Sequence, residues 1–180
     1  MSWAAAPRWI TQPQNFSDAV TSGLEFELRG RASDLMPQLM GNAKALNIRS
    51  SLSFYRSSIA ALPGPNNRLD GQQPWSANLG FDQRISGLPL SVGGNLSITP
   101  GYDTRQTTEQ YFKRSSTKGI DLFAMMPLSP TMSLRAAASA GVQQFGPPNG
   151  RTQTLLSNGD YILTDRYAKP QLNITLDMRL

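Results

Sequence analysis

Apolar and polar residues alternate strictly along the last ten residues of the chain, QLNITLDMRL. Every second residue from Leu172 to Leu180 is apolar, and each residue between them is polar or charged. Successive side chains of a β-strand point to opposite faces of the sheet, so this segment predicts a strand with one apolar face. That face requires either the core of a soluble protein or lipid, and the segment alone does not distinguish the two.

The same period of two recurs along the chain and predicts eight strands. Their approximate ranges are 3–11, 20–33, 45–57, 74–86, 88–100, 117–128, 131–143 and 169–180. Pro7 interrupts the first of these, and the strand at 117–128 carries the apolar Phe123 and Met125 on its second face. We expect a single all-β domain over 1–180, an antiparallel up-and-down meander of about eight long strands.

Strand length and connection length both favour a segment of a transmembrane β-barrel over a soluble β-sandwich. Most predicted strands have about 10 to 14 residues, whereas soluble strands average about 5–6 and a bilayer-crossing strand needs about 9–11. Barrels of outer membranes carry long loops on one rim and tight turns on the other. The predicted connections follow this alternation: long at 58–73, 101–116 and 144–168, short at 87 and 129–130, moderate at 12–19 and 34–44.

Aromatic and charged residues fit a barrel, although neither feature alone excludes a sandwich. Four aromatic residues lie at predicted strand ends beside the long connections, where a membrane barrel has an aromatic girdle: Trp9, Tyr55, Trp75 and Tyr102. Aromatic residues also favour strands in general. The polar face, which is the lumen side of a barrel or the solvent side of a sandwich, receives Glu25, Glu27, Arg29, Arg49, Asp82, Arg84 and Arg135.

Composition removes several classes of function. The chain has no Cys and no His, which excludes disulfides, thiolate metal sites and Ser-His-Asp triads and weighs against an enzyme. No apolar run is long enough for a transmembrane helix, and the first residues lack the pattern of a signal peptide. The net charge is +5, but the cations are scattered, so we expect no nucleic-acid partner.

The candidate site residues favour no catalytic, cofactor or metal role. Glu25 and Glu27 lie on one face of a strand as acid/base candidates, but they are better explained as a polar row beside Arg29 and Arg31. The outer-loop carboxylates Asp103, Glu109, Asp160 and Asp165 lack the spacing of a calcium loop. The Asn-X-Ser/Thr sequences at Asn15, Asn95 and Asn173 are expected to occur by chance. A loop patch of Tyr111, Phe112, Lys113 and Arg114 is a candidate contact for an anionic ligand or lipopolysaccharide phosphates, weighed against an ordinary solvated loop. The ligand-binding residues stay unknown.

Several stretches together resemble the C-terminal β-barrel portion of TonB-dependent outer-membrane receptors. RWITQPQN followed by SGLEFELRGR is similar to a strand-loop-strand passage of that family. The family's strand, extracellular loop and strand are similar to LNIRSSLSFYRSSI followed by LPGPNNRLDGQQPWSANLGFDQRI. The hairpin partner of that last strand is similar to LPLSVGGNLSITPGY, and the family's terminal strand is similar to QLNITLDMRL. The similarity covers about residues 7–180. It implies uptake of a scarce ligand such as a siderophore across the outer membrane of a Gram-negative bacterium.

Departures from the family pattern limit what the resemblance implies. Such receptors have a signal peptide, a TonB-contacting box, a plug domain and 22 barrel strands, so we expect this chain to be a truncated portion that does not transport alone. TonB coupling would require an upstream plug. The implied partners are outer-membrane lipid and the barrel-assembly machinery, which reads a terminal Phe where this chain has Leu180. A self-contained small outer-membrane barrel and a soluble β-sandwich binding module remain as alternatives.

Overall fold

The computed structural model describes residues 17–40, 45–141, 150–156, 158–167 and 169–179. Over these residues the protein is all-β and its paired strands are antiparallel, which confirms the predicted fold class at this level. Seven strands form the main sheet, in the order β1-β2-β3-β4-β7-β8-β11. Their bounds are β1 Ala19–Arg31, β2 Leu46–Ile59, β3 Trp75–Arg84, β4 Ser91–Thr99, β7 Thr117–Ser129, β8 Met132–Gly141 and β11 Gln171–Met178.

The main sheet matches seven of the predicted ranges to within a few residues at each end. Each strand pairs with its predicted sequence neighbour, so the described part of the meander has the expected topology. The predicted strand at 3–11 lies outside the described residues. The sheet is open in the structure, because β1 and β11 occupy its two edges and are not paired with each other.

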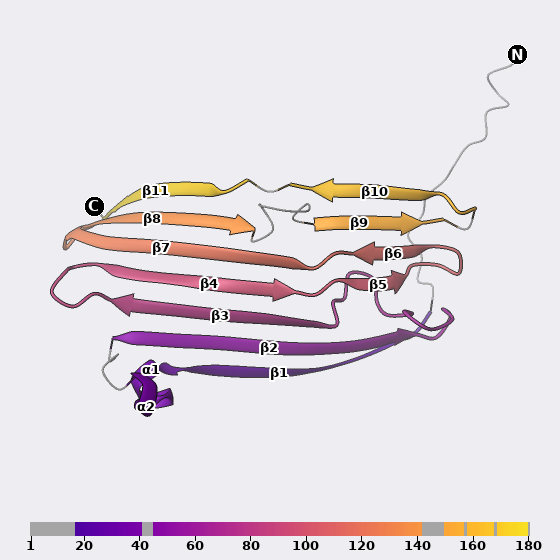
Figure 1. The fold of residues 1–180 in the computed structure, drawn as a ribbon, viewed down its shortest axis with the longest axis horizontal. Coiled ribbons are helices and arrows are strands. Elements are labelled where there is room, and N and C mark those ends of the chain that lie inside the picture. Colours follow the sequence, from indigo (N-terminus) through magenta and orange to yellow (C-terminus); the bar gives the residue numbers. More distant parts are fainter. Residues whose placement is uncertain (1–16, 41–44, 142–149, 157, 168, 180) are drawn as a thin grey trace, which may run out of the picture.

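Three of the predicted connections contain strands or helices that the period-two pattern did not predict. The range 101–116 contains the hairpin of β5 (Tyr102–Arg105) and β6 (Tyr111–Arg114), and 144–168 contains β9 (Gly150–Leu155) and β10 (Tyr161–Arg166). These strands form a second sheet in the order β10-β9-β6-β5, which continues the main sheet lengthwise (Figure 1). The range 34–44 contains most of two single-turn helices, α1 (Ala32–Leu35) and α2 (Pro37–Met40).

One predicted turn was also wrong. The connection between β3 and β4 spans residues 85–90 rather than residue 87 alone, because Ile85 and Leu90 close a hydrogen-bonded turn with Gly87 at a positive φ of 78°. The two hairpin turns and the two helices lie at one end of the sheet, and the second sheet lies at the other (Figure 1). We call these the turn end and the loop end.

The strand register places the apolar alternate residues of all seven strands on one face, which we call the apolar face. Directly opposed residues of antiparallel strands point to the same side of a sheet. Phe26 of β1 opposes Leu52 of β2, which opposes Ala77 of β3. The match continues across the sheet to β11, where Leu172, Ile174, Leu176 and Met178 oppose Ala138, Ala136, Leu134 and Met132 of β8. The intervening residues form the polar face.

No second layer covers the apolar face among the described residues. Leu172 and Ile174 on β11 are 72% and 70% exposed, and Leu24, Phe26 and Leu28 on β1 are all more than half exposed. The total accessible surface is 13468 Å², whereas a compact monomer of this mass exposes roughly 8,600 Å². The main sheet therefore lacks the dry interior that a soluble domain builds around its apolar residues.

The connection between β2 and β3 is folded back against the loop end, and we call residues 60–74 the loop latch. The Asn67 side chain donates to the carbonyls of Ile59 and Leu62, both at 3.2 Å. The amide of Arg105 in β5 donates to the Asn66 carbonyl at 2.7 Å, which attaches the latch to the second sheet. Leu62 is buried, and so are Tyr102 and Thr104 of β5.

We predict that Gly93→Ala destabilises the fold, because Gly93 on β4 has no space for a side chain. An added Cβ would lie 2.5 Å from the Phe123 ring and 2.7 Å from the carbonyl oxygen of Phe81, and that backbone oxygen cannot move away cheaply. Overpacking of this kind costs about 1–3 kcal/mol. The midpoint of a urea titration should fall.

Gly150→Ala is the matched control, because its nearest neighbour would be a methyl carbon of Thr117 at an ordinary 3.8 Å. Equal midpoints for the two variants would contradict the close packing of Phe123 on Gly93.

Candidate functional site on the polar face

The polar face carries a balanced set of charges across the seven strands. Its cations are Arg29, Arg31, Arg49, Arg84 and Arg135, and its anions are Glu25, Glu27, Asp82, Asp121 and Asp177. One cross-strand row runs through Arg29, Arg49, Gly80, Asn95, Asp121, Ser139 and Gln171. Because directly opposed side chains interact, this row and its neighbours form one continuous polar surface.

Arg49 lies flat across this surface because its neighbour on β3 is a glycine. A Cβ at Gly80 would lie 2.7 Å from Arg49 Nε, so the Arg49 side chain in this position uses space that the glycine leaves. The Asp82 carboxylate is 3.8 Å from Arg49 Nη1 and also accepts a hydrogen bond from the Asn47 amide at 3.0 Å. These exposed polar contacts orient the side chains, but each contributes less than about 1 kcal/mol to stability.

Phe123 and Arg135 form the second fixed element of the face. The Phe123 ring fills the space over Gly93, and the Arg135 guanidinium lies 5.4 Å from its ring centroid, a cation–π arrangement. This explains why the apolar Phe123 is accommodated among polar neighbours. The sequence pattern placed Phe123 and Met125 on the second face of this strand, and the register agrees.

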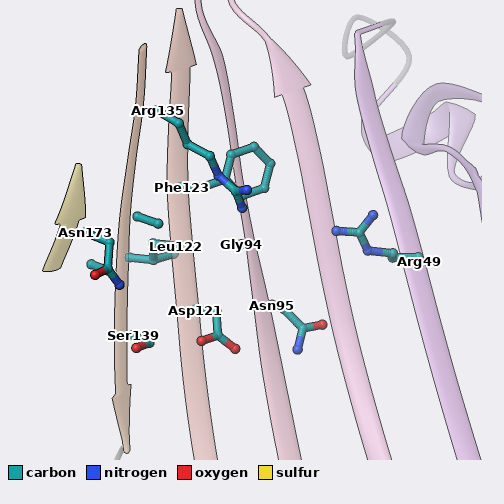
Figure 2. A pocket seen from close by; sticks show the side chains of 11 residues that line it. Arg49, Gly94, Asn95, Asp121, Leu122, Phe123, Arg135, Ser139 and Asn173 are labelled. Atoms are coloured by element: carbon teal, nitrogen blue, oxygen red, sulfur yellow. The ribbon is translucent and has the colours of Figure 1, made fainter. Parts of the chain in front are cut away.

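A shallow depression of about 400 Å³ lies between Arg49 and the Phe123–Arg135 pair (Figure 2). Asn95, Asp121, Ser139 and Asn173 also line it and present amide, carboxylate and hydroxyl groups. Asp121 and Arg135 form no ion pair with the described residues. The depression is therefore a surface with free hydrogen-bonding capacity for a polar solute, and it is open rather than enclosed.

The predicted carboxylate pair on β1 lies in the polar face but is engaged by its neighbours. Glu27 forms a salt bridge with Arg29 at 2.5 Å, and Glu25 accepts a hydrogen bond from the Tyr55 hydroxyl at 2.7 Å. This pairing corrects the girdle prediction, because Tyr55 opposes Gly23 and lies on the polar face. Tyr102 also leaves the girdle, since it is 7% exposed in the second sheet. Trp75 alone of the described candidates lies on the apolar face, opposite Phe54, and Trp9 lies outside the described residues.

The outer-loop carboxylates are held apart from one another, because they belong to different strands and turns of the second sheet. Asp103 lies 4.0 Å from Lys113, Asp160 accepts from the Asn158 amide at 2.6 Å, and Asp165 forms a two-point contact with Arg151 at 2.7 and 2.8 Å. In the described part of the chain, no three metal-binding side chains come together. The patch at 111–114 is a strand, β6, so its four side chains alternate between two faces instead of forming one surface. Arg105 stacks on Tyr111 at 4.4 Å.

The loop end contains the buried polar atoms that sequence reasoning missed. In the part of the chain that the structure describes, five buried side-chain atoms have no hydrogen-bond partner: Arg68 Nε and Nη1, Tyr102 Oη, Thr104 Oγ1 and Arg105 Nε. All belong to the loop latch or to β5. The turn signature Asn158–Gly159, between two short stretches rich in residues that favour strands, TQTLL and YILTD, was a usable signal for the β9–β10 hairpin. No comparable signal identifies the latch.

Comparison with known proteins finds no matching family model, no matching curated protein and no matching solved structure. The described residues also contain no helix that is long and apolar enough to cross a membrane.

We predict that the Asp165–Arg151 pair stabilises the β9–β10 hairpin at neutral pH. The hydrogen bond from Arg151 lowers the pKa of the Asp165 carboxyl below its ordinary value. The contribution is therefore complete above the ordinary carboxyl pKa and is lost as the pH falls through the lowered value of the folded protein. A carbon-13 NMR titration of the carboxyl measures this midpoint. Arg151→Gln should move it upward, and an unchanged midpoint would refute the pairing.

We predict that Thr104→Val maintains or raises stability. The Thr104 side chain is 0% exposed and its hydroxyl has no partner, so an isosteric methyl group removes a buried, unsatisfied hydroxyl. Relief of that penalty amounts to about 1–3 kcal/mol. Thr104→Ser, which retains the hydroxyl and deletes the methyl group, should instead lower the urea midpoint. Destabilisation by Val equal to that by Ser would mean that the hydroxyl is hydrogen-bonded.

Proposed function

We propose that this chain forms part of the wall of a transmembrane β-barrel in the outer membrane of a Gram-negative bacterium. The observation that carries the proposal is the apolar face that no second layer of described residues covers. Its side chains have no protein layer against them among the described residues, and burying apolar surface is the main favourable term in folding and in membrane insertion. Hydrocarbon is the medium that satisfies such a face.

The size of the apolar face supports lipid as its medium. From Val20 to Leu28 on β1, or from Leu172 to Met178 on β11, the apolar residues extend about 20–27 Å along the strand at 3.4 Å per residue. Transmembrane strands are tilted by about 35–45°, so these stretches would rise about 14–22 Å within a lipid-facing band that is about 25 Å tall. The polar face then lines a wet lumen, and the second sheet and the loop latch project beyond the band.

The edges of the main sheet favour a barrel with more strands than the seven described here. In hydrocarbon, each unpaired backbone group costs several kcal/mol, so a spanning sheet must be closed. A self-contained barrel would require β1 to pair with β11, and a sandwich would require a second layer. Neither arrangement is present among the described strands. Additional strands pairing with these edges satisfy the constraint.

The role in transport rests on resemblance to TonB-dependent receptors. On this proposal, the chain supplies wall, lumen surface and external loops for the passage of a siderophore-like or other scarce ligand. The depression bounded by Arg49 and Arg135 would present polar groups to the lumen contents. Energy coupling through TonB requires a plug domain, and insertion by the barrel-assembly machinery would use β11. No enzymatic step is proposed.

We predict that lipid contacts Trp75 directly. In the full chain with Trp3→Phe and Trp9→Phe, Trp75 is the sole tryptophan and lies on the apolar face. After reconstitution into phosphatidylcholine vesicles, acyl chains brominated near the headgroup should quench its fluorescence strongly, because bromine acts only at close range.

A water-soluble quencher that suppresses Trp75 as it does in the urea-unfolded chain would contradict the proposal. So would a monodisperse folded protein in plain buffer.

A further inference from the structure

Two charged side chains interrupt the apolar face, and both are cations at its loop end. The register assigns Arg56 of β2 to this face because it opposes Ser22, two residues from the Leu24–Phe54 pair. Lys118 of β7 opposes Ile98 of β4 and lies on the same face. Along the seven described strands, no other residue of the apolar face is charged.

The placement of these cations differs from that of every other charge on the main sheet. Arg56 lies near the end of β2 that leads into the loop latch, and Lys118 is the second residue of β7, after the second sheet. The turn end of the same face has only uncharged residues, including Met126, Met132 and Met178. On the polar face, by contrast, arginines and carboxylates are equal in number.

Neither cation has an acidic partner in the described structure. Arg56 and Lys118 make no salt bridge and no side-chain hydrogen bond with the described residues, and both are exposed. An unpaired cation that faces hydrocarbon extends toward the interface, where its charged group finds anionic oxygen and its methylene groups stay in the apolar layer. Phosphate oxygens of lipid headgroups meet that requirement at the height of the loop end.

We propose that Arg56 and Lys118 bind the phosphate groups of anionic lipids in the leaflet on the loop side. The inference rests on the proposed membrane insertion and adds a lipid class and a leaflet to it. Each cation offers several N–H donors to phosphate oxygen. β2 and β7 are three strand spacings apart, about 14 Å, so the two side chains take separate phosphates.

Trp75 lies near both cations, so its fluorescence can report which lipids are bound there. It opposes Phe54, which is two residues from Arg56 on the same face of β2. It is also two residues from Ala77, which opposes Ile98, the partner of Lys118. Diagonal neighbours on one face lie about 7–8 Å apart. Lipid held by Arg56 therefore places its acyl chains against the indole, with Lys118 two strands away.

The experiment uses the single-tryptophan full chain in phosphatidylcholine vesicles that contain a minor fraction of phosphatidylglycerol. In one sample only the phosphatidylglycerol is brominated, and in the other only the phosphatidylcholine is. We expect the quenching by brominated phosphatidylglycerol to correspond to a local mole fraction of this lipid about fivefold above its bulk value. That enrichment corresponds to about 1 kcal/mol for one Lys or Arg near an anionic surface. High salt should reduce the excess.

Arg56→Gln combined with Lys118→Gln should return the quenching by phosphatidylglycerol to the bulk mole fraction. Arg56→Lys with Lys118→Arg should preserve the excess. Arg84→Gln is the matched control, since it removes one cation from the polar face at the turn end and should change nothing.

Quenching by brominated phosphatidylcholine reports insertion independently in every variant. If it persists while the parent chain shows no excess for phosphatidylglycerol, the phosphate sites are refuted and membrane insertion stands. An excess that survives the double glutamine variant also refutes these two residues as the sites. Loss of quenching by both lipids in the parent chain refutes the proposed membrane function itself.

Discussion

The shared phase of seven β-strands is the constraint on which the rest of the structure depends. Side chains alternate with a period of two, so a slip of one residue in any strand would move its apolar residues to the opposite face. The register avoids this at every pairing, from Leu24 opposite Phe54 at one edge to Leu176 opposite Leu134 at the other. The apolar face is therefore a collective property of the sheet.

Two requirements follow from a single-layer sheet with such a face. The apolar side needs an apolar medium, and the backbone groups at both edges need partners. The polar face has a constraint of its own, because its large side chains must pack directly on the backbone of the sheet where no second layer of the described chain lies above them. Gly80 and Gly93 provide for this by leaving space in which Arg49 and Phe123 lie flat on the backbone.

Local alternation was sufficient to predict the strands of the main sheet, because each strand carries its own two-faced pattern. It failed where position depends on contacts distant in sequence. β5 and β6 have four residues each, too few to establish a period, and they are held by pairing with each other and with β9. The face of Tyr55 follows from its odd spacing to Leu52 and Phe54 on the same strand, which the sequence already contained and which a prediction from strand-end position overlooked.

The polar depression could not be predicted from the sequence for a related reason. Its residues come from β2, β4, β7, β8 and β11, and only the register brings them together. The loop latch is likewise held by hydrogen bonds between segments distant in sequence, such as that from the Arg105 amide to the Asn66 carbonyl, and neither sequence indicates that the other segment is its partner. Sequence periodicity determines which face a residue occupies, whereas tertiary pairing determines its neighbours.

The distribution of charge separates the two faces by the kind of recognition each supports. Fixed charges on the polar face balance, so its field cancels beyond about 8 Å, the screening length at physiological salt. A solute there would be selected by short-range hydrogen bonds from groups such as Asn95, Asp121 and Arg135. Over the seven strands that the structure describes, the apolar face has two cations and no anion, and both cations lie at the loop end. Recognition on the polar face would thus depend on short-range geometry, and on the proposed membrane insertion the two cations would give the apolar face an electrostatic preference for one leaflet.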